Sequence, residues 1–284
     1  MKIAFIGASG MLGAPVAREL IRSGHDITLL ARDINKMQKL FPGAKMAKGD
    51  VFDKESLLHI LTGQDLVYMN LSVPQNSKEK ERQPEREGVK NIIAAAKEKR
   101  IHRLIYLSSL IKNYEGMNDF SWWAFDIKQK AVDEIKASGI PYIIFYPSTF
   151  METFPHQMIR GNKIMMLGNS VAPMWFIAAE DFAKQVAIAL QFSGNKEYVI
   201  QGLEPFTFDE AAKVMTDNAR KKKLKIIKLP IGLIRFFGKF NAKMNYGARI
   251  CEALNKYPEK FESEETWKEL GKPVTSLKNF ASAL

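Results

Sequence analysis

Lys2-Ile3-Ala4-Phe5-Ile6-Gly7-Ala8-Ser9-Gly10-Met11-Leu12-Gly13 joins a short apolar run to a turn that contains three glycines. The run has the composition of a buried parallel strand, and apolar residues recur at helical spacing from Met11 to Leu20. The start of a helix offers free N–H groups and the positive end of a dipole to an anion. The stretch therefore predicts a strand, turn and helix that bind a dinucleotide pyrophosphate.

Each glycine of this turn has an expected purpose. Gly7 can adopt backbone angles that are closed to other residues, Gly10 leaves room for the pyrophosphate, and Gly13 lets the helix pack closely on the strand. The spacing is G-x-x-G-x-x-G rather than G-x-G-x-x-G. A purely structural strand, turn and helix is the alternative, and the context of the motif favours the nucleotide site.

Length and composition set the class of protein. The chain has 284 residues, 46% of them hydrophobic, which suffices for one large domain or two closely joined ones. No apolar stretch is long enough to span a bilayer, and Met1 leads directly into the first strand, so we expect a cytoplasmic protein. The single cysteine, Cys251, and four scattered histidines favour neither a disulfide framework nor a metal site.

The net charge of +11 is densest over Arg220–Lys228. This stretch can contact nucleic acid or an anionic membrane, or it can be a solvated helix end that leads into an edge strand. No aromatic residues alternate with these lysines as a base-stacking surface requires. We therefore favour the solvated segment and expect no nucleic-acid partner.

Strands and helices alternate along the first half of the chain. Strands are predicted at 3–6, 25–31, 44–49, 65–71, 103–108 and 142–146, and helices follow the glycine turn and occupy 34–40, 54–61, 85–99 and 120–138. This order predicts an α/β Rossmann fold, a doubly wound parallel sheet with helices on both faces. Ligands of such a sheet bind at the carboxyl ends of its strands.

After Pro147 the predicted elements become shorter. We expect a helix over 180–190, a strand over 196–201, a helix over 208–216, a strand over 223–229 and mostly helical structure beyond. The expected division is an NAD(P)-binding domain at 1–153 and a smaller α+β substrate or partner lobe at 154–284 that packs on it.

The end of the second strand bears on the choice of cofactor. NAD-binding proteins commonly have an acidic residue there, whereas this chain has Ala31 followed by Arg32. A guanidinium can pair with a 2′-phosphate and stack on adenine, and Ser9 can add a hydroxyl, so we expect NADP(H) in preference to NAD(H). Asp33 either repels that phosphate or caps the next helix.

Asp50 and Val51 follow the third strand, where an adenine edge would lie. The Asp50 carboxylate can accept a hydrogen bond from the adenine amino group, or it can serve as a helix cap. Asp53 fits the cap better because it directly precedes the helical run.

Several of these motifs, taken in order, resemble the NmrA-like atypical short-chain dehydrogenases. They are Gly7–Gly13, Arg32, Gly49–Asp53, Leu107–Ser109, Lys128 and Tyr146–Glu152, followed by Phe176–Ala183, Tyr198–Gly202 and Phe206–Glu210. The resemblance spans most of the chain and implies an extended Rossmann fold with a small carboxy-terminal lobe and an NAD(P) cofactor across the sheet. Members of the family include isoflavone-type, phenylcoumaran benzylic ether and quinone reductases, and also sensors that bind NADP without catalysis.

The family resemblance assigns Lys128 as the catalytic lysine, with contact to the cofactor ribose as the alternative. Ordinary short-chain dehydrogenases place a tyrosine four residues before this lysine, where this chain has Ala124. The usual tyrosine proton donor is therefore missing, and a desolvated lysine acting directly as acid or base would have to replace it.

Further cofactor contacts are expected where later strands end. The fourth strand supplies Asn70, Leu71 and Ser72, the fifth supplies Ser108, and the sixth supplies backbone groups for the nicotinamide. These last residues are Tyr146, Pro147, Ser148, Thr149 and Phe150, with Ser148 where relatives commonly have glycine. With Gly7, Ser9, Gly10, Met11, Leu12, Arg32, Asp50, Val51 and Lys128, they make up the predicted cofactor site.

Aromatic and thioether side chains lie near the predicted nicotinamide end, and for substrate contact we name Trp122, Trp123, Met151 and Phe154. A small apolar or aromatic molecule such as a quinone or enone suits them, although such residues are more often core. The helix predicted at Pro230–Phe240 either lies on a membrane or covers a pocket, and we favour the pocket.

Two functions fit these features. The first is an NADPH-dependent reductase of an apolar carbonyl, enone or quinone, with Lys128 or water supplying the proton. The second is a non-catalytic NADP(H)-binding redox sensor that acts on a protein partner through the loop Ser72–Pro84. A sugar-nucleotide epimerase is less favoured because its chemistry also relies on the missing tyrosine, and the sequence indicates no oligomeric state.

Overall fold

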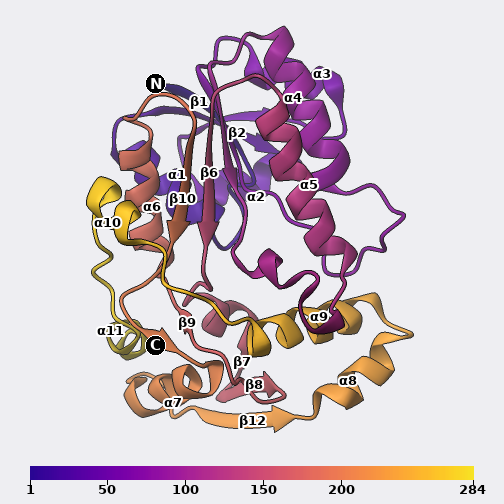
Figure 1. Cartoon of the computed structure of the whole chain (residues 1–284). Coiled ribbons are helices and arrows are strands. Elements are labelled where there is room, and N and C mark those ends of the chain that lie inside the picture. Colours follow the sequence, from indigo (N-terminus) through magenta and orange to yellow (C-terminus); the bar gives the residue numbers. More distant parts are fainter.

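A seven-stranded parallel sheet organises the computed structural model, which describes residues 1–284 (Figure 1). Its strands lie in the order β10-β6-β5-β4-β1-β2-β3. The strand bounds are β1 Lys2–Ile6, β2 Asp26–Ala31, β3 Lys45–Lys48, β4 Leu66–Met69, β5 Arg103–Leu107, β6 Tyr142–Pro147 and β10 Lys196–Ile200. The predicted Rossmann class is confirmed.

Helices cover both faces of this sheet (Figure 1). One face carries α1, α2 and α6, and the other carries α3, α4 and α5, as the two largest hydrophobic clusters show. The bounds are α1 Gly13–Arg22, α2 Ile34–Leu40, α3 Lys54–Leu61, α4 Val89–Glu98, α5 Trp123–Ala137 and α6 Ala179–Ala189. None of the chain's helices is both long and apolar enough to cross a membrane.

The strand order reverses between β1 and β4. From β1 the chain proceeds outward through β2 and β3, and it then returns to place β4 on the other side of β1. Connections that diverge from one point leave a crevice beyond the carboxyl ends of the two central strands. The glycine turn after Ile6 and the polar residues after Met69 lie at this crevice.

The small lobe combines short strands with helices. It contains β7 Ile159–Arg160, β8 Lys163–Leu167, β9 Met174–Trp175, β11 Pro205–Phe206, α7 Phe208–Asn218, β12 Lys225–Leu229, α8 Ile231–Gly238, α9 Ala242–Lys256 and α11 Leu277–Ser282. α10, Glu264–Leu270, packs instead beside α6 and β10 of the main sheet. One three-stranded sheet has the order β12-β8-β7, and β9 pairs with β11. The lobe lies beyond the carboxyl ends of β6 and β10 (Figure 1).

Most predicted elements lie within a few residues of the observed ones, and the exceptions have physical causes. The helix expected from Glu85 begins as a π-turn at Pro84–Gly88 before α4, because Pro84 lacks an N–H and Gln83 accepts the first bonds of the turn. Four short strands of the lobe, β7, β8, β9 and β11, were not predicted, since two to five residues show no clear periodicity. Residues beyond 153 also supply β10 and α6 to the main sheet.

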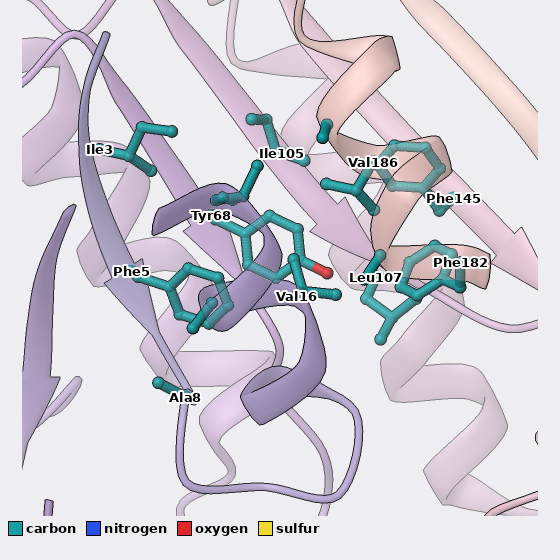
Figure 2. Packing of buried hydrophobic residues seen from close by; sticks show 14 of the residues in the cluster. Ile3, Phe5, Ala8, Val16, Tyr68, Ile105, Leu107, Phe145, Phe182 and Val186 are labelled. Atoms are coloured by element: carbon teal, nitrogen blue, oxygen red, sulfur yellow. The ribbon is translucent and has the colours of Figure 1, made fainter. Parts of the chain in front are cut away.

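Tyr68 lies at the centre of the larger hydrophobic cluster (Figure 2). Its ring stacks on Phe5 with 4.5 Å between centroids, and its hydroxyl is buried without a hydrogen-bond partner. Burial raises the pKa of this hydroxyl, so it stays protonated. The ring therefore supplies packing, while the hydroxyl carries a desolvation cost.

We predict that Tyr68→Phe leaves the free energy of unfolding unchanged or raises it by about 1 kcal/mol, because the stacked ring stays and the unpaired hydroxyl is removed. Phe5→Ala should lower it by about 3–5 kcal/mol through loss of packing. Urea unfolding followed by circular dichroism measures both. A loss of stability in Tyr68→Phe would mean that the hydroxyl has a partner.

Candidate functional site

The glycine turn is fixed by close backbone contacts. Gly7 has a φ of +92°, and a Cβ atom there would lie 2.0 Å from the carbonyl oxygen of Asn70. A Cβ on Gly13 would lie 2.1 Å from the carbonyl oxygen of Gly7. Both expected roles are confirmed: no side chain fits at either position without moving β1, β4 or α1.

Gly10 differs from these two glycines. A Cβ there would lie at ordinary van der Waals distance, 3.5 Å from the carbonyl oxygen of Gly7 and 3.6 Å from the Asn70 amide nitrogen, so the missing side chain does not relieve a clash. Beside it, the N–H groups of Met11, Leu12 and Gly13 donate to no backbone acceptor, and no side chain caps α1. Free N–H groups at a helix start, beside a residue that carries no side chain, fit a pyrophosphate.

Arg32 and Ser9 are both exposed, and Arg32 directly follows β2, the strand beside β1. Arg32 forms no ion pair, whereas Asp33 caps α2 by accepting a hydrogen bond from the backbone N–H of Lys36 at 3.0 Å. Of the two roles considered for Asp33, the cap is therefore the one observed. The guanidinium remains available to an anionic ligand.

The carboxylates that follow β3 accept hydrogen bonds from nearby backbone N–H groups. Asp50 accepts a hydrogen bond from the N–H of Phe52 at 3.0 Å, and Asp53 caps α3 through the N–H of Glu55. The Val51 side chain is buried, and a Cβ on Gly88 would lie 2.8 Å from it. Val51 therefore packs under the π-turn, and its carbonyl oxygen accepts a hydrogen bond from the Asn91 amide at 3.0 Å.

At the carboxyl ends of β4 and β5, Asn70 and Ser108 offer side-chain groups to the crevice. The Asn70 amide donates to the carbonyl oxygen of Gly7 at 3.4 Å and so joins the turn to β4. Leu71 is buried and Ser72 is exposed. The Ser108 hydroxyl is buried without a partner, an orphan group of the kind that a ribose or substrate oxygen can satisfy.

Lys128 forms an ion pair with Glu85, which is the least expected contact of the site. Glu85 is 1% exposed and also accepts hydrogen bonds from the Tyr106 hydroxyl at 2.6 Å and from the Val73 N–H at 3.1 Å. Burial, reinforced by the Glu85 carboxylate, raises the pKa of Tyr106 well above its usual value. The buried carboxylate of Glu85 thus contacts groups from β5, α5 and the loop that follows β4.

Another lysine, Lys112, is more deeply buried than Lys128 and was not singled out from the sequence. Its ammonium group donates to the side-chain oxygens of Gln129 at 2.6 Å and Asn113 at 3.0 Å, and it lies 5.3 Å from the centre of the Tyr146 ring. Burial lowers the pKa of Lys112. Its position in the turn just after β5 is the only sequence signal that would have indicated it.

The segment after β6 is largely occupied by contacts within the protein. The Tyr146 hydroxyl donates to Glu197 at 2.7 Å, and the Ser148 hydroxyl donates to Glu259 at 2.8 Å. The carbonyl oxygen of Thr149 accepts from Ile177, and both Pro147 and Phe150 are buried. The Tyr146 and Ser148 side chains and part of the backbone are therefore engaged within the protein, and contact of this segment with a nicotinamide stays a prediction.

Glu259 is a further residue that the sequence analysis missed. It accepts hydrogen bonds from Ser148, from the Gln201 side chain at 2.7 Å and from the Trp175 N–H at 3.4 Å. Burial raises the pKa of its carboxyl group, and these hydrogen bonds partly offset that shift. The carboxyl group joins the small lobe to the end of β6.

The predicted substrate residues do not form one group. Trp122, Met151 and Phe154 are each at most 4% exposed and belong to two different hydrophobic clusters, as the core alternative expects, and their contact with a substrate stays a prediction. Only Trp123 is partly exposed. Tyr246 of α9 packs against Trp122 with 4.9 Å between ring centres and brings the small lobe over this region.

A cavity of about 550 Å³ lies at the opposite end of the sheet, lined by residues of α1, α2 and the starts of β2 and β3. It includes Arg18, His25 and Asp26. Because ligands of doubly wound sheets bind at the carboxyl ends of the strands, this shallow cavity is not the nucleotide site.

Comparisons with known proteins agree with this geometry. The photosystem II assembly factor Ycf39 of Cyanophora paradoxa is 24% identical over 260 residues, which cover 89% of this chain and 79% of that protein. An NADPH-dependent quinone oxidoreductase of Escherichia coli, solved with NADPH, has a TM-score of 0.74 at 21% identity over 99% of both chains. A nucleoside-diphosphate-sugar epimerase of Staphylococcus aureus has a TM-score of 0.75 at 18% identity over 99% of this chain and 100% of that one.

These two structures establish the fold alone, since enzymes of different activity share it. The family assignment comes from a family model described as NAD(P)H-binding, which matches residues 7–191. The match begins at the first glycine of the turn and includes Arg32, Lys128 and the end of β6. The chain belongs to the NAD(P)H-binding family.

Proposed function

We propose that this protein is an NADPH-dependent reductase of a small apolar carbonyl, enone or quinone. The observation that carries the proposal is the Lys128–Glu85 pair, which lies at the carboxyl ends of β4 and β5, on the same edge of the sheet as the glycine turn. An ammonium group in that place can protonate a substrate oxygen, and the unpartnered Ser108 hydroxyl can orient it.

Each residue has a distinct role in this proposal. The free N–H groups of Met11, Leu12 and Gly13 hold the pyrophosphate. Bound NADPH supplies the hydride. Lys128 then donates a proton to the oxygen of the reduced substrate and regains one from water. Glu85 holds Lys128 in place, and the bonds from Tyr106 and Val73 fix Glu85 in turn.

The preference for NADPH rests on Arg32. Its exposed guanidinium lacks an acidic partner, and Asp33 is engaged as a helix cap. A guanidinium provides several donors in a planar fork that matches a 2′-phosphate. The same position would give NADH no comparable contact.

An apolar substrate is favoured by the surface around α5 and α9. Ile111, Trp123, Tyr246 and Ile250 are partly buried against the cluster that contains Trp122. These side chains expose apolar area beside the carboxyl ends of the strands. A flat, weakly polar molecule fits such a surface better than a charged one.

A redox sensor that acts on a protein partner is the second candidate. Ala124 occupies the position four residues before Lys128, so the usual tyrosine acid is absent. The similarity to Ycf39, named as an assembly factor, also favours a role exercised through another protein. The two candidates differ in turnover, which only the reductase shows.

We predict that Lys128→Met lowers kcat for quinone or enone reduction by about 100-fold or more, because it removes the proton donor. The dissociation constant for NADPH, measured by calorimetry, should change much less. Lys130→Met is the matched control, since Lys130 lies on the same helix but is exposed and pairs only with Asp126.

Removing Lys128 alone leaves Glu85 buried and unpaired, which can destabilise the fold. The double variant Glu85→Gln/Lys128→Met removes both charges and should be as inactive as Lys128→Met while melting near the wild-type temperature. If the folded double variant keeps its turnover, Lys128 is not the proton donor. If wild-type protein binds NADPH but reduces no member of a quinone and enone panel, the sensor replaces the reductase.

We predict that Arg32→Glu weakens NADPH binding by about tenfold or more, because charge-assisted hydrogen bonds to a phosphate are lost. NADH binding should change little. Calorimetric titration of both nucleotides measures the preference, with Lys39→Glu at the far end of α2 as the control. Equal losses for the two nucleotides would argue against recognition of the 2′-phosphate by Arg32.

A further inference from the structure

Helix α8 exposes an apolar stripe to solvent. Its members are Leu233, Phe236 and Phe237 of the helix and Phe240 in the turn that follows Gly238. They keep the i, i+3, i+4, i+7 spacing of one helix face and are 50%, 56%, 46% and 82% exposed. The expectation that this helix covers a pocket is therefore wrong. An apolar stripe of this kind on a chain's surface marks an interaction site.

The packing of α8 on α9 determines that the apolar stripe faces outward. Gly238 is buried on the opposite side of α8, and a Cβ there would lie 3.0 Å from the Cα of Asn245 in α9. Arg235 forms an ion pair with Glu252 of α9. Ile231 and Ile234 are only partly exposed on the inner side. Because small and inward-facing residues make the contact with α9, the phenylalanines are left facing outward.

The charge around the stripe has a single sign. Between Asn218 and Cys251 the chain carries ten basic residues and no acidic one. Lys228 pairs with Asp209 and Arg235 with Glu252, while the other eight form no ion pair. These eight are Arg220, Lys221, Lys222, Lys223, Lys225, Lys239, Lys243 and Arg249. β12 and α8 follow one another along the edge of the molecule farthest from the N-terminus (Figure 1).

We propose that β12, α8 and the residues flanking them, 220–243, form a docking surface for an anionic lipid bilayer. A helix with an outward stripe of phenylalanine and leucine beside lysines lies in the plane of a membrane interface. Unpaired lysines add attraction to anionic headgroups. A symmetric contact between two copies of this chain is disfavoured because it would bring the same basic groups together.

The test is co-sedimentation of the full chain with vesicles of phosphatidylcholine alone and of phosphatidylcholine mixed with phosphatidylglycerol. Only the anionic vesicles should bind the protein, and added salt should weaken binding. Phe236→Ser/Phe237→Ser/Phe240→Ser should lower the partition coefficient by about tenfold or more, since the three exposed aromatic rings that would enter the bilayer are removed. Lys222→Glu/Lys223→Glu should lower it as well.

Val171→Ser/Val274→Ser is the matched control, because these valines are 75% and 71% exposed outside the surface. Circular dichroism and the melting temperature verify that every variant folds. The proposal is wrong if the protein binds neither vesicle, binds both equally, or binds anionic vesicles as well without the three phenylalanines. It is also wrong if the same substitutions abolish self-association or RNA binding while vesicle binding is absent.

Discussion

The close approach of Gly7 to Asn70 is the constraint on which the site depends. It occurs where the strand order reverses, so β1 and β4 must lie side by side while their connections diverge. Since no Cβ fits at Gly7 or Gly13, the turn is pressed against β4 and the start of α1 is drawn over β1. The free N–H groups of α1 then face the crevice at the switch point, where a nucleotide binds in this fold.

A buried carboxylate organises the other half of the crevice. Glu85 receives the ammonium of Lys128, the hydroxyl of Tyr106 and the N–H of Val73, so one side chain aligns an α-helix, a strand and a loop. A fully buried carboxylate is costly without such partners. The presence of a buried carboxylate beside the predicted catalytic lysine is explained if the carboxylate holds that lysine in a fixed position.

The elements that were predicted correctly depend on patterns among residues that are neighbours in the sequence. The helix at Lys54–Leu61 and the cap by Asp53 follow from neighbouring residues, and so do the strands and the glycine turn. Contacts between distant residues were not predictable in this way. Glu85 reads as part of an ordinary helix, Glu259 as one of many acidic residues near the C-terminus, and the outward face of α8 depends on how Gly238 meets α9. The burial of Trp122, Met151 and Phe154 was also not predictable, because an aromatic or apolar composition does not distinguish a pocket from a core.

NADPH titration of wild-type protein and of Gly10→Leu, with heat of binding as the measurement, tests the nucleotide site most directly. A Cβ at Gly10 would lie 3.5 Å or more from its neighbours and meet no clash, so we expect the variant to fold, and its melting temperature verifies this. We expect the wild type to bind NADPH and a leucine in the space for the pyrophosphate to abolish binding. Equal binding by the two proteins, or no binding of either NADPH or NADH by the wild type, would contradict the assignment of this turn as the nucleotide site.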